Sequence, residues 1–98
     1  MIVVRNSFSV DPTRMKEAIT MAKDGRDIVK RLGFPVPRLG VDLAAEFYTL
    51  VLETEFASLA DFESRLPQNF ASTEWQQWYT RFTALVRGGR REIFRIVE

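Results

Sequence analysis

The sequence contains no cysteine and no histidine. Without cysteine, the chain cannot form disulfides, hold an iron–sulfur cluster through thiolates or use a thiolate nucleophile. Without histidine, it cannot build a Ser-His-Asp triad, a His-ligated haem site or nearly any of the usual zinc sites. These absences exclude several large classes of enzyme, and we expect the protein to use no metal and no other cofactor.

Charge of one sign and long apolar runs are lacking as well. Fourteen Lys and Arg balance thirteen Asp and Glu, so no overall field attracts nucleic acid or an anionic membrane. No segment approaches the roughly 18 consecutive apolar residues of a membrane span. The apolar start, residues 1–4, meets Arg5 and Asn6 before a signal-peptide core forms. We therefore expect a cytoplasmic protein without nucleic-acid or membrane partners.

What is present is the pattern of one domain spanning residues 1–98. Alternating or β-branched apolar segments predict strands over residues 2–8, 37–41, 47–53 and 91–97. Helices are expected to begin at Asp11-Pro12, at Ser58, and near Ser72 or Thr73, where capping residues stand. The first is expected to end at Gly33, the second at Pro67 and the third at a Gly88-Gly89 turn.

The order of these elements is β-α-β-β-α-α-β, which predicts an α+β, ferredoxin-like fold with an antiparallel sheet. Right-handed crossovers place the first and third strands in the centre and the fourth beside the first. Alternation assigns one set of residues to the face beneath the helices: Ile2, Val4, Tyr48, Leu50, Leu52, Phe94 and Ile96. The opposite face then carries Val3, Arg5, Ser7, Phe47, Thr49, Val51, Glu53, Ile93, Arg95 and Val97.

That opposite face is too apolar to face water freely, and such a patch usually marks an interface. Two sheets packed face to face would bury it, which predicts a homodimer with two-fold symmetry and a shared α/β barrel.

Three stretches carry a resemblance to known proteins: Thr49–Glu63, Glu74–Tyr79 and Arg91–Arg95. Together with the strand order, they resemble dimeric α/β-barrel proteins, in particular the NIPSNAP-like and stress-responsive barrel families. The resemblance covers nearly the whole chain and implies the same fold and dimer. Such families include cofactor-free monooxygenases, isomerases, haem enzymes and many members without an assigned activity, so the fold does not name the reaction.

The first candidate site is the charged group Arg5, Glu53 and Arg95 on the face away from the helices. We favour an interstrand ion-pair network that fixes the register of the dimer. The alternative is a site in the dimer cavity that holds an anionic substrate, with Glu53 as a base.

The second candidate site is aromatic: Trp75, Trp78 and Tyr79 lie on one stripe of the third helix, with Tyr48 nearby. Core packing is the ordinary interpretation of such a stripe. The resemblance implies another, because cofactor-free oxygenases of this superfamily enclose a flat substrate between helices and sheet. By position, Asn6, Tyr48 and Trp78 would line that pocket.

Haem and RNA are disfavoured. Haem sites of relatives usually rely on histidine, and residues 47–53 lack the glycine and cations of an RNA-binding third strand. Two functions remain. One is a homodimer of NIPSNAP-like or stress-responsive type without classical catalytic residues. The other is a cofactor-independent monooxygenase or isomerase acting on a small aromatic or anionic metabolite. The presence of a cavity between the aromatic helix and the sheet distinguishes these two functions, because an enzyme would have no substrate site if the helix packed flush on the sheet.

Overall fold

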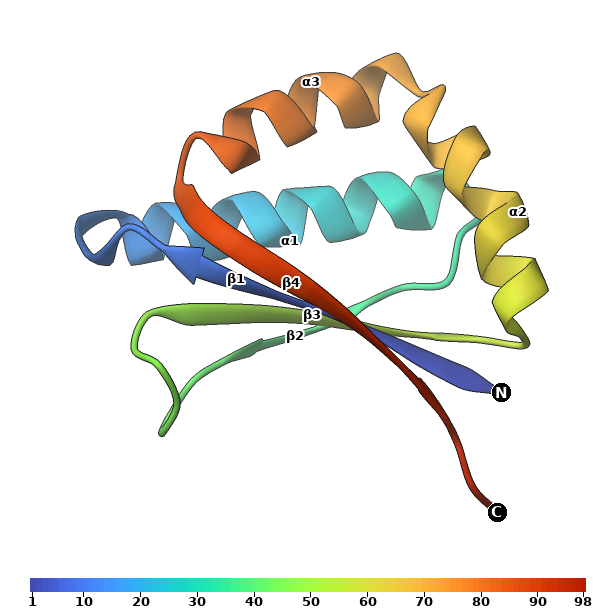
Figure 1. The fold of residues 1–98 in the computed structure, drawn as a ribbon. Coiled ribbons are helices and arrows are strands. Elements are labelled where there is room, and N and C mark those ends of the chain that lie inside the picture. The colour runs from blue at the N-terminus through green and yellow to red at the C-terminus, as the bar shows by residue number, and fades with distance from the viewer.

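A single antiparallel sheet carries all the helices on one of its two faces (Figure 1). The computed structural model describes residues 1–98. The elements in chain order are β1 (Ile2–Val10), the short 3-10 helix η1 (Pro12–Arg14), α1 (Met15–Arg31), β2 (Arg38–Val41), β3 (Thr49–Phe56), α2 (Leu59–Phe70), α3 (Thr73–Thr83) and β4 (Val86–Arg95). None of the helices has the length and hydrophobicity that a membrane span requires.

The order of strands across the sheet is β2-β3-β1-β4, and each neighbouring pair is antiparallel. Strands β1 and β3 occupy the centre and β4 lies beside β1, so the predicted ferredoxin-like βαββααβ fold is confirmed. In register, Arg5 stands between Glu53 of β3 and Glu92 of β4. Residues directly opposite in a ladder point to the same face, so this register fixes which side chains meet the helices.

The main core lies between α1, α3 and the sheet. Helix α1 presents its small residues Ala18, Ala22 and Gly25 to the large aromatic side chains Trp78 and Phe82 of α3. The buried residues of α1 are mostly small, and Leu32, which directly follows the helix, is exposed. Small residues at these positions let α1 approach the α3 rings closely.

A smaller cluster forms beneath α2, where Phe62 packs on Ile2 and Val4 of β1. The prediction that α2 ends at Pro67 is wrong, because the helix continues to Phe70. Proline removes one backbone hydrogen bond and crowds the preceding turn, at a cost of about 3 kcal/mol. The helix nevertheless continues for three residues past Pro67, and its last residue, Phe70, packs edge to face on Trp75.

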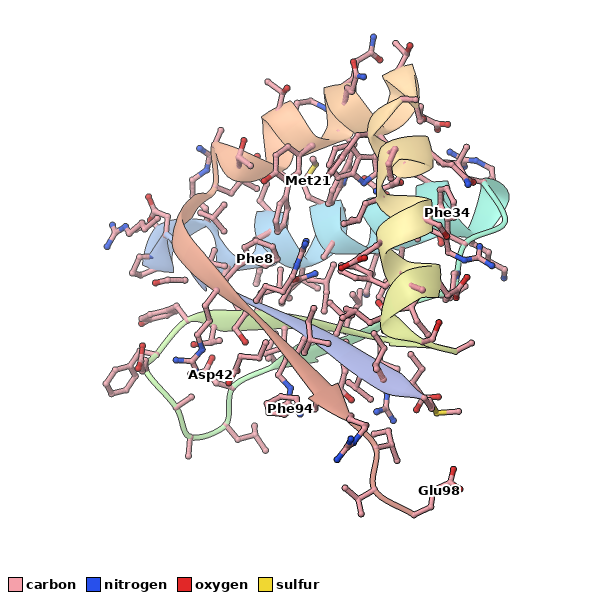
Figure 2. All side chains as sticks on the ribbon, turned by 45° about the vertical axis from the view of Figure 1, so that its right-hand side comes forward. Phe8, Met21, Phe34, Asp42, Phe94 and Glu98 are labelled. Atoms are coloured by element: carbon pink, nitrogen blue, oxygen red, sulfur yellow. The ribbon has the colours of Figure 1, made fainter.

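Gly88 and Gly89 do not form the predicted turn; they lie inside β4, opposite Ser9 and Phe8. A β-carbon at position 89 would lie 2.9 Å from the Ser7 carbonyl oxygen and 3.0 Å from the Phe8 ring, so the glycine makes room for both. The strand therefore begins earlier than predicted and its alternation differs by one residue. Ile93 and Arg95 lie on the helix side and Phe94 on the other, the reverse of the prediction. Figure 2 shows Phe94 below the sheet, opposite to Phe8.

The expected start of the third strand is also wrong. Phe47 and Tyr48 lie in the loop before β3, with φ angles of 65° and 54° in the left-handed region. The loop is closed at its base by two hydrogen bonds between Asp42 and Thr49, and the Tyr48 carbonyl accepts from the Val10 amide. Neither aromatic side chain belongs to the sheet face to which alternation assigned it.

Candidate functional site

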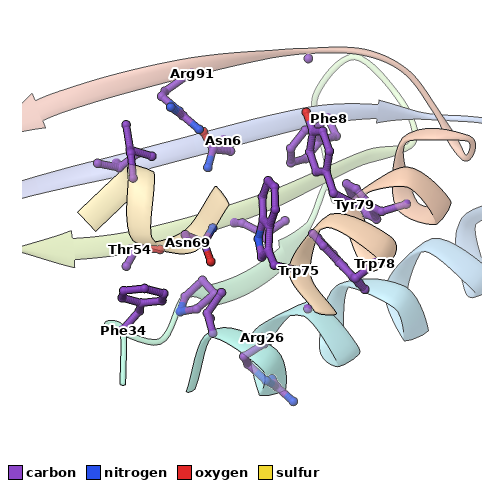
Figure 3. Close-up of a pocket in the computed structure, with 18 of the residues that line it drawn as sticks. Asn6, Phe8, Arg26, Phe34, Thr54, Asn69, Trp75, Trp78, Tyr79 and Arg91 are labelled. Atoms are coloured by element: carbon purple, nitrogen blue, oxygen red, sulfur yellow. The ribbon is translucent and has the colours of Figure 1, made fainter. Parts of the chain in front are cut away.

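The aromatic helix does not pack flush on the sheet. A cavity of about 580 Å³ lies between the sheet, α2, α3 and the C-terminal half of α1 (Figure 3). Its floor consists of helix-facing residues of β1 and β3, among them Asn6, Phe8 and Thr54. Helix α2 crosses the end of the α1–α3 pair instead of continuing alongside it (Figure 1), so α1, α2 and α3 all contribute to the walls.

Aromatic rings form one wall of the cavity. Trp75 and Tyr79 stack with ring centroids 4.7 Å apart, and Phe70 meets Trp75 edge to face at 5.0 Å. Trp78 lies deeper, only 6% exposed, and stacks on Phe82 at 5.0 Å. Its indole Nε1–H donates to the Met21 carbonyl at 2.6 Å. Trp78 is therefore a core residue whose donor is engaged, while Trp75 and Tyr79 offer ring surface to a ligand.

Three of the predicted aromatic residues and Asn6 come together at this cavity, but Tyr48 does not. Tyr48 is 46% exposed and lies in the loop before β3. Alternation placed it in the strand because aromatic residues favour strands, whereas the chain there takes the left-handed conformation.

Polar groups approach the cavity from several elements. Asn6 Oδ1 accepts a hydrogen bond of 2.8 Å from Arg91 Nε of β4, and the Arg91 guanidinium carbon lies 5.4 Å from the centre of the Phe62 ring. Asn69 of α2 has a buried Oδ1 without a hydrogen-bond partner. Figure 3 shows Asn69 between Thr54 and Trp75. Sequence reasoning missed Asn69 because it ended the helix at Pro67, and it missed Arg91 because the register was unknown.

The charge of the cavity has one sign. Its lining includes five arginines, at positions 26, 65, 87, 90 and 91, and no Asp, Glu or Lys. Arg90 stands opposite Ser7, so its side chain lies on the other face of the sheet and only its backbone borders the cavity. The cavity therefore suits a ligand with negative charge. Chemically, the lining can orient a flat molecule, exclude part of the water and stabilise negative charge, but it offers no carboxylate, imidazole or thiolate as a base.

The charged group on the open face of the sheet, the face away from the helices, is separate from the cavity. Glu53 Oε2 accepts from Arg5 Nε at 3.0 Å and Glu53 Oε1 from Arg38 Nη2 at 2.6 Å. These two hydrogen bonds, from Arg38 first and Arg5 second, lower the pKa of Glu53 below its ordinary value. The guanidinium of Arg5 also lies 5.2 Å from the centre of the Phe94 ring.

The expectation that Arg95 joins this network is wrong. Arg95 stands opposite Ile2 near the end of β4, and its side chain is on the helix side. Arg38 of the edge strand β2 takes its place, because β2 pairs with β3 in a register that sets Arg38 opposite Glu53. With both carboxylate oxygens bound by arginine and a lowered pKa, Glu53 is a poor base.

The fold and cavity define an α+β protein with a ferredoxin-like sheet, three helices on one face and a site between the two layers. Solved structures share this arrangement. A NIPSNAP family protein from Agrobacterium tumefaciens superposes with a TM-score of 0.84 at 18% identity, covering 99% of this chain and 93% of that one. An uncharacterized NIPSNAP domain protein from Burkholderia xenovorans superposes with a TM-score of 0.87 at 10% identity, covering 99% of this chain and 95% of that one.

A putative antibiotic biosynthesis monooxygenase from Deinococcus radiodurans is also similar, with a TM-score of 0.73 at 12% identity over 100% of this chain and 94% of that one. The sequence itself matches no protein-family model and no curated protein. At these identities the likeness is one of fold. It confirms the ferredoxin-like fold that the resemblance to NIPSNAP-like proteins implied.

Proposed function

We propose that this protein is a homodimer of the NIPSNAP-like type, located in the cytoplasm, that binds a small organic molecule in the cavity between sheet and helices. The observation that carries the proposal is the cavity itself. Its volume of about 580 Å³ falls within the roughly 300–1,000 Å³ of small-molecule sites. Its lining also has their usual character, with aromatic walls and a few polar groups.

The open sheet face supports the dimer. It presents Val51 and Phe94 around the charged network of Glu53 with Arg5 and Arg38. No segment of the chain covers this face (Figure 1). Phe94 remains 43% exposed in the single chain. A second copy would cover these residues. Arg5 and Arg38 already bind the Glu53 carboxylate within one chain, which lowers the cost of burying these three charged groups.

A second candidate function is a cofactor-independent monooxygenase or isomerase. The fold of the antibiotic biosynthesis monooxygenases favours it, as does the arginine-rich cavity. In such an enzyme the substrate would react in its ionised form. The residues of this chain would hold the negative charge and keep the ring plane against Trp75.

The binding proposal is tested with N-phenyl-1-naphthylamine, a neutral dye that fluoresces in apolar sites. Thr54→Phe adds a ring from the cavity floor, while Thr20→Phe adds the same ring on the exposed face of α1. We expect the wild type and Thr20→Phe to bind the dye and Thr54→Phe to lose it, with circular dichroism unchanged. Leu66→Phe is a second filling variant in case Thr54→Phe does not fold. Equal binding by a folded filling variant and the wild type would contradict the proposal.

A further inference from the structure

The arginines around the cavity differ in whether a carboxylate neutralises them. Arg65 Nε lies 3.0 Å from Asp61 Oδ1. Arg90, Arg87 and Arg26 lie within 4 Å of Glu92, Asp11 and Asp27, respectively. Arg91 alone among the five has no acidic partner within that distance. The positive charge of Arg91 is therefore available to a ligand.

Arg91 is also held in place. Its Nε donates to Asn6 Oδ1 at 2.8 Å, and its guanidinium lies over the ring of Phe62 at 5.4 Å. The two terminal nitrogens, Nη1 and Nη2, form no hydrogen bond within the chain. A guanidinium fixed through Nε presents these two nitrogens as a pair, which matches the spacing of two oxygens of a carboxylate or sulfonate. Figure 3 shows Arg91 reaching from β4 toward Asn6 at the cavity.

The other residues that line the cavity indicate the shape and polarity of the rest of the ligand. The stacked pair Trp75 and Tyr79, with Phe34 and Phe70, gives the cavity flat apolar surface. On another wall, the buried Oδ1 of Asn69 lacks a donor, and an unsatisfied buried acceptor costs about as much as a lost hydrogen bond. A ligand that brings a hydroxyl or N–H to Asn69 would remove this cost.

We propose that Arg91, positioned by Asn6 and Phe62, binds the anionic group of the ligand, and that the ligand is a planar aromatic organic acid. This inference rests on the proposed function, because it requires that the cavity binds a small molecule. It goes further by naming the chemical class of the ligand and the residue that selects it.

The test uses two dyes that share one ring system. 8-Anilino-1-naphthalenesulfonate carries a sulfonate, and N-phenyl-1-naphthylamine lacks it. Both are titrated into the wild type, Arg91→Gln and Arg81→Gln, at one salt concentration. Arg81 is a matched control, because it is an exposed arginine of α3 that has no carboxylate within 4 Å and does not line the cavity.

We expect the wild type to bind the sulfonate more tightly than the neutral dye. Arg91→Gln should weaken sulfonate binding about tenfold or more, the usual effect of losing a charged hydrogen-bond donor. Binding of the neutral dye should change by less than about twofold, and Arg81→Gln should behave as the wild type does. If Arg91→Gln and Arg81→Gln weakened sulfonate binding equally, or if the wild type bound the two dyes equally tightly, the role of Arg91 would be overturned. In that case, retained neutral-dye binding would leave the cavity proposal standing, whereas binding of neither dye would overturn both.

Discussion

Replacing Gly25 by alanine should destabilise this protein although the change favours the helix. Gly25 lies inside α1 beneath the indole ring of Trp78. A β-carbon there would lie 2.5 Å from Trp78 Cε2 and 2.8 Å from Cη2, and closer still to Cζ2. The ring cannot move easily, since its Nε1–H donates a hydrogen bond to the Met21 carbonyl and the ring stacks on Phe82.

The expected magnitude follows from three contributions. Helix propensity favours alanine over glycine by about 1 kcal/mol. Overpacking a fitted core costs about 1–3 kcal/mol, and weakening the Trp78 hydrogen bond costs about 0.5–1.5 kcal/mol. We expect a net loss of about 1–3 kcal/mol in the free energy of unfolding, because the two costs outweigh the gain in propensity.

Urea unfolding followed by tryptophan fluorescence, at one protein concentration, measures this loss. Gly40→Ala is the matched control: nothing lies within 4 Å of its added β-carbon, so its effect should stay within about 0.5 kcal/mol. A Gly25→Ala protein as stable as the wild type, or more stable, would refute the close packing of α1 on Trp78.

Three further predictions concern the open face and the loop before β3. Because the pKa of Glu53 is lowered in the folded state, its ion pairs stabilise the protein above the ordinary pKa of about 4.3 and less so as the pH falls through the folded value. Glu53→Gln should therefore lower the free energy of unfolding by about 1–2 kcal/mol at pH 7, and urea titrations should show that this variant loses less stability on acidification than the wild type. An equal loss on acidification in the two proteins would contradict this. Phe47→Gly removes the strain of a non-glycine residue in the left-handed region, about 1–2 kcal/mol, and adds a glycine entropy cost of about 0.5–1 kcal/mol. The melting temperature of this variant should therefore stay equal or rise, whereas that of the control Ala45→Gly should fall. Val51→Lys places a charge in the centre of the open face and should give a monomer in sedimentation experiments, whereas Thr20→Lys should not; a Val51→Lys dimer would argue against this face as the interface.

The sequence predicts the fold well because element order and alternation are local properties. The pattern around Ile2 to Phe8 and the capping residue Ser58 each specify an element without knowledge of its neighbours. Strand order then follows from the handedness of the crossovers. The misassigned positions are those where tertiary contacts override local preference. Gly89 is paired with Phe8 in the β1–β4 ladder, and Pro67 lies in a helix whose residues Phe62 and Phe70 pack on β1 and on Trp75.

The candidate site was predictable only in part. Helical spacing predicts Trp75 and Tyr79 on one stripe, and the resemblance to cofactor-free oxygenases points to Asn6. Arg91 and Arg38 were missed because they act through strand register, and a shift of one residue moves a side chain to the other face. The cavity depends on the direction in which α2 leaves the sheet, which no local pattern encodes.

Native mass spectrometry, with and without 8-anilino-1-naphthalenesulfonate, tests the central claim most directly. The account predicts a complex of two 11.4 kDa chains that retains one dye per chain. It further predicts that Thr54→Phe remains a dimer and retains no dye. A single 11.4 kDa chain at micromolar concentration would contradict the dimer, and dye retained equally by Thr54→Phe would contradict the cavity as the binding site.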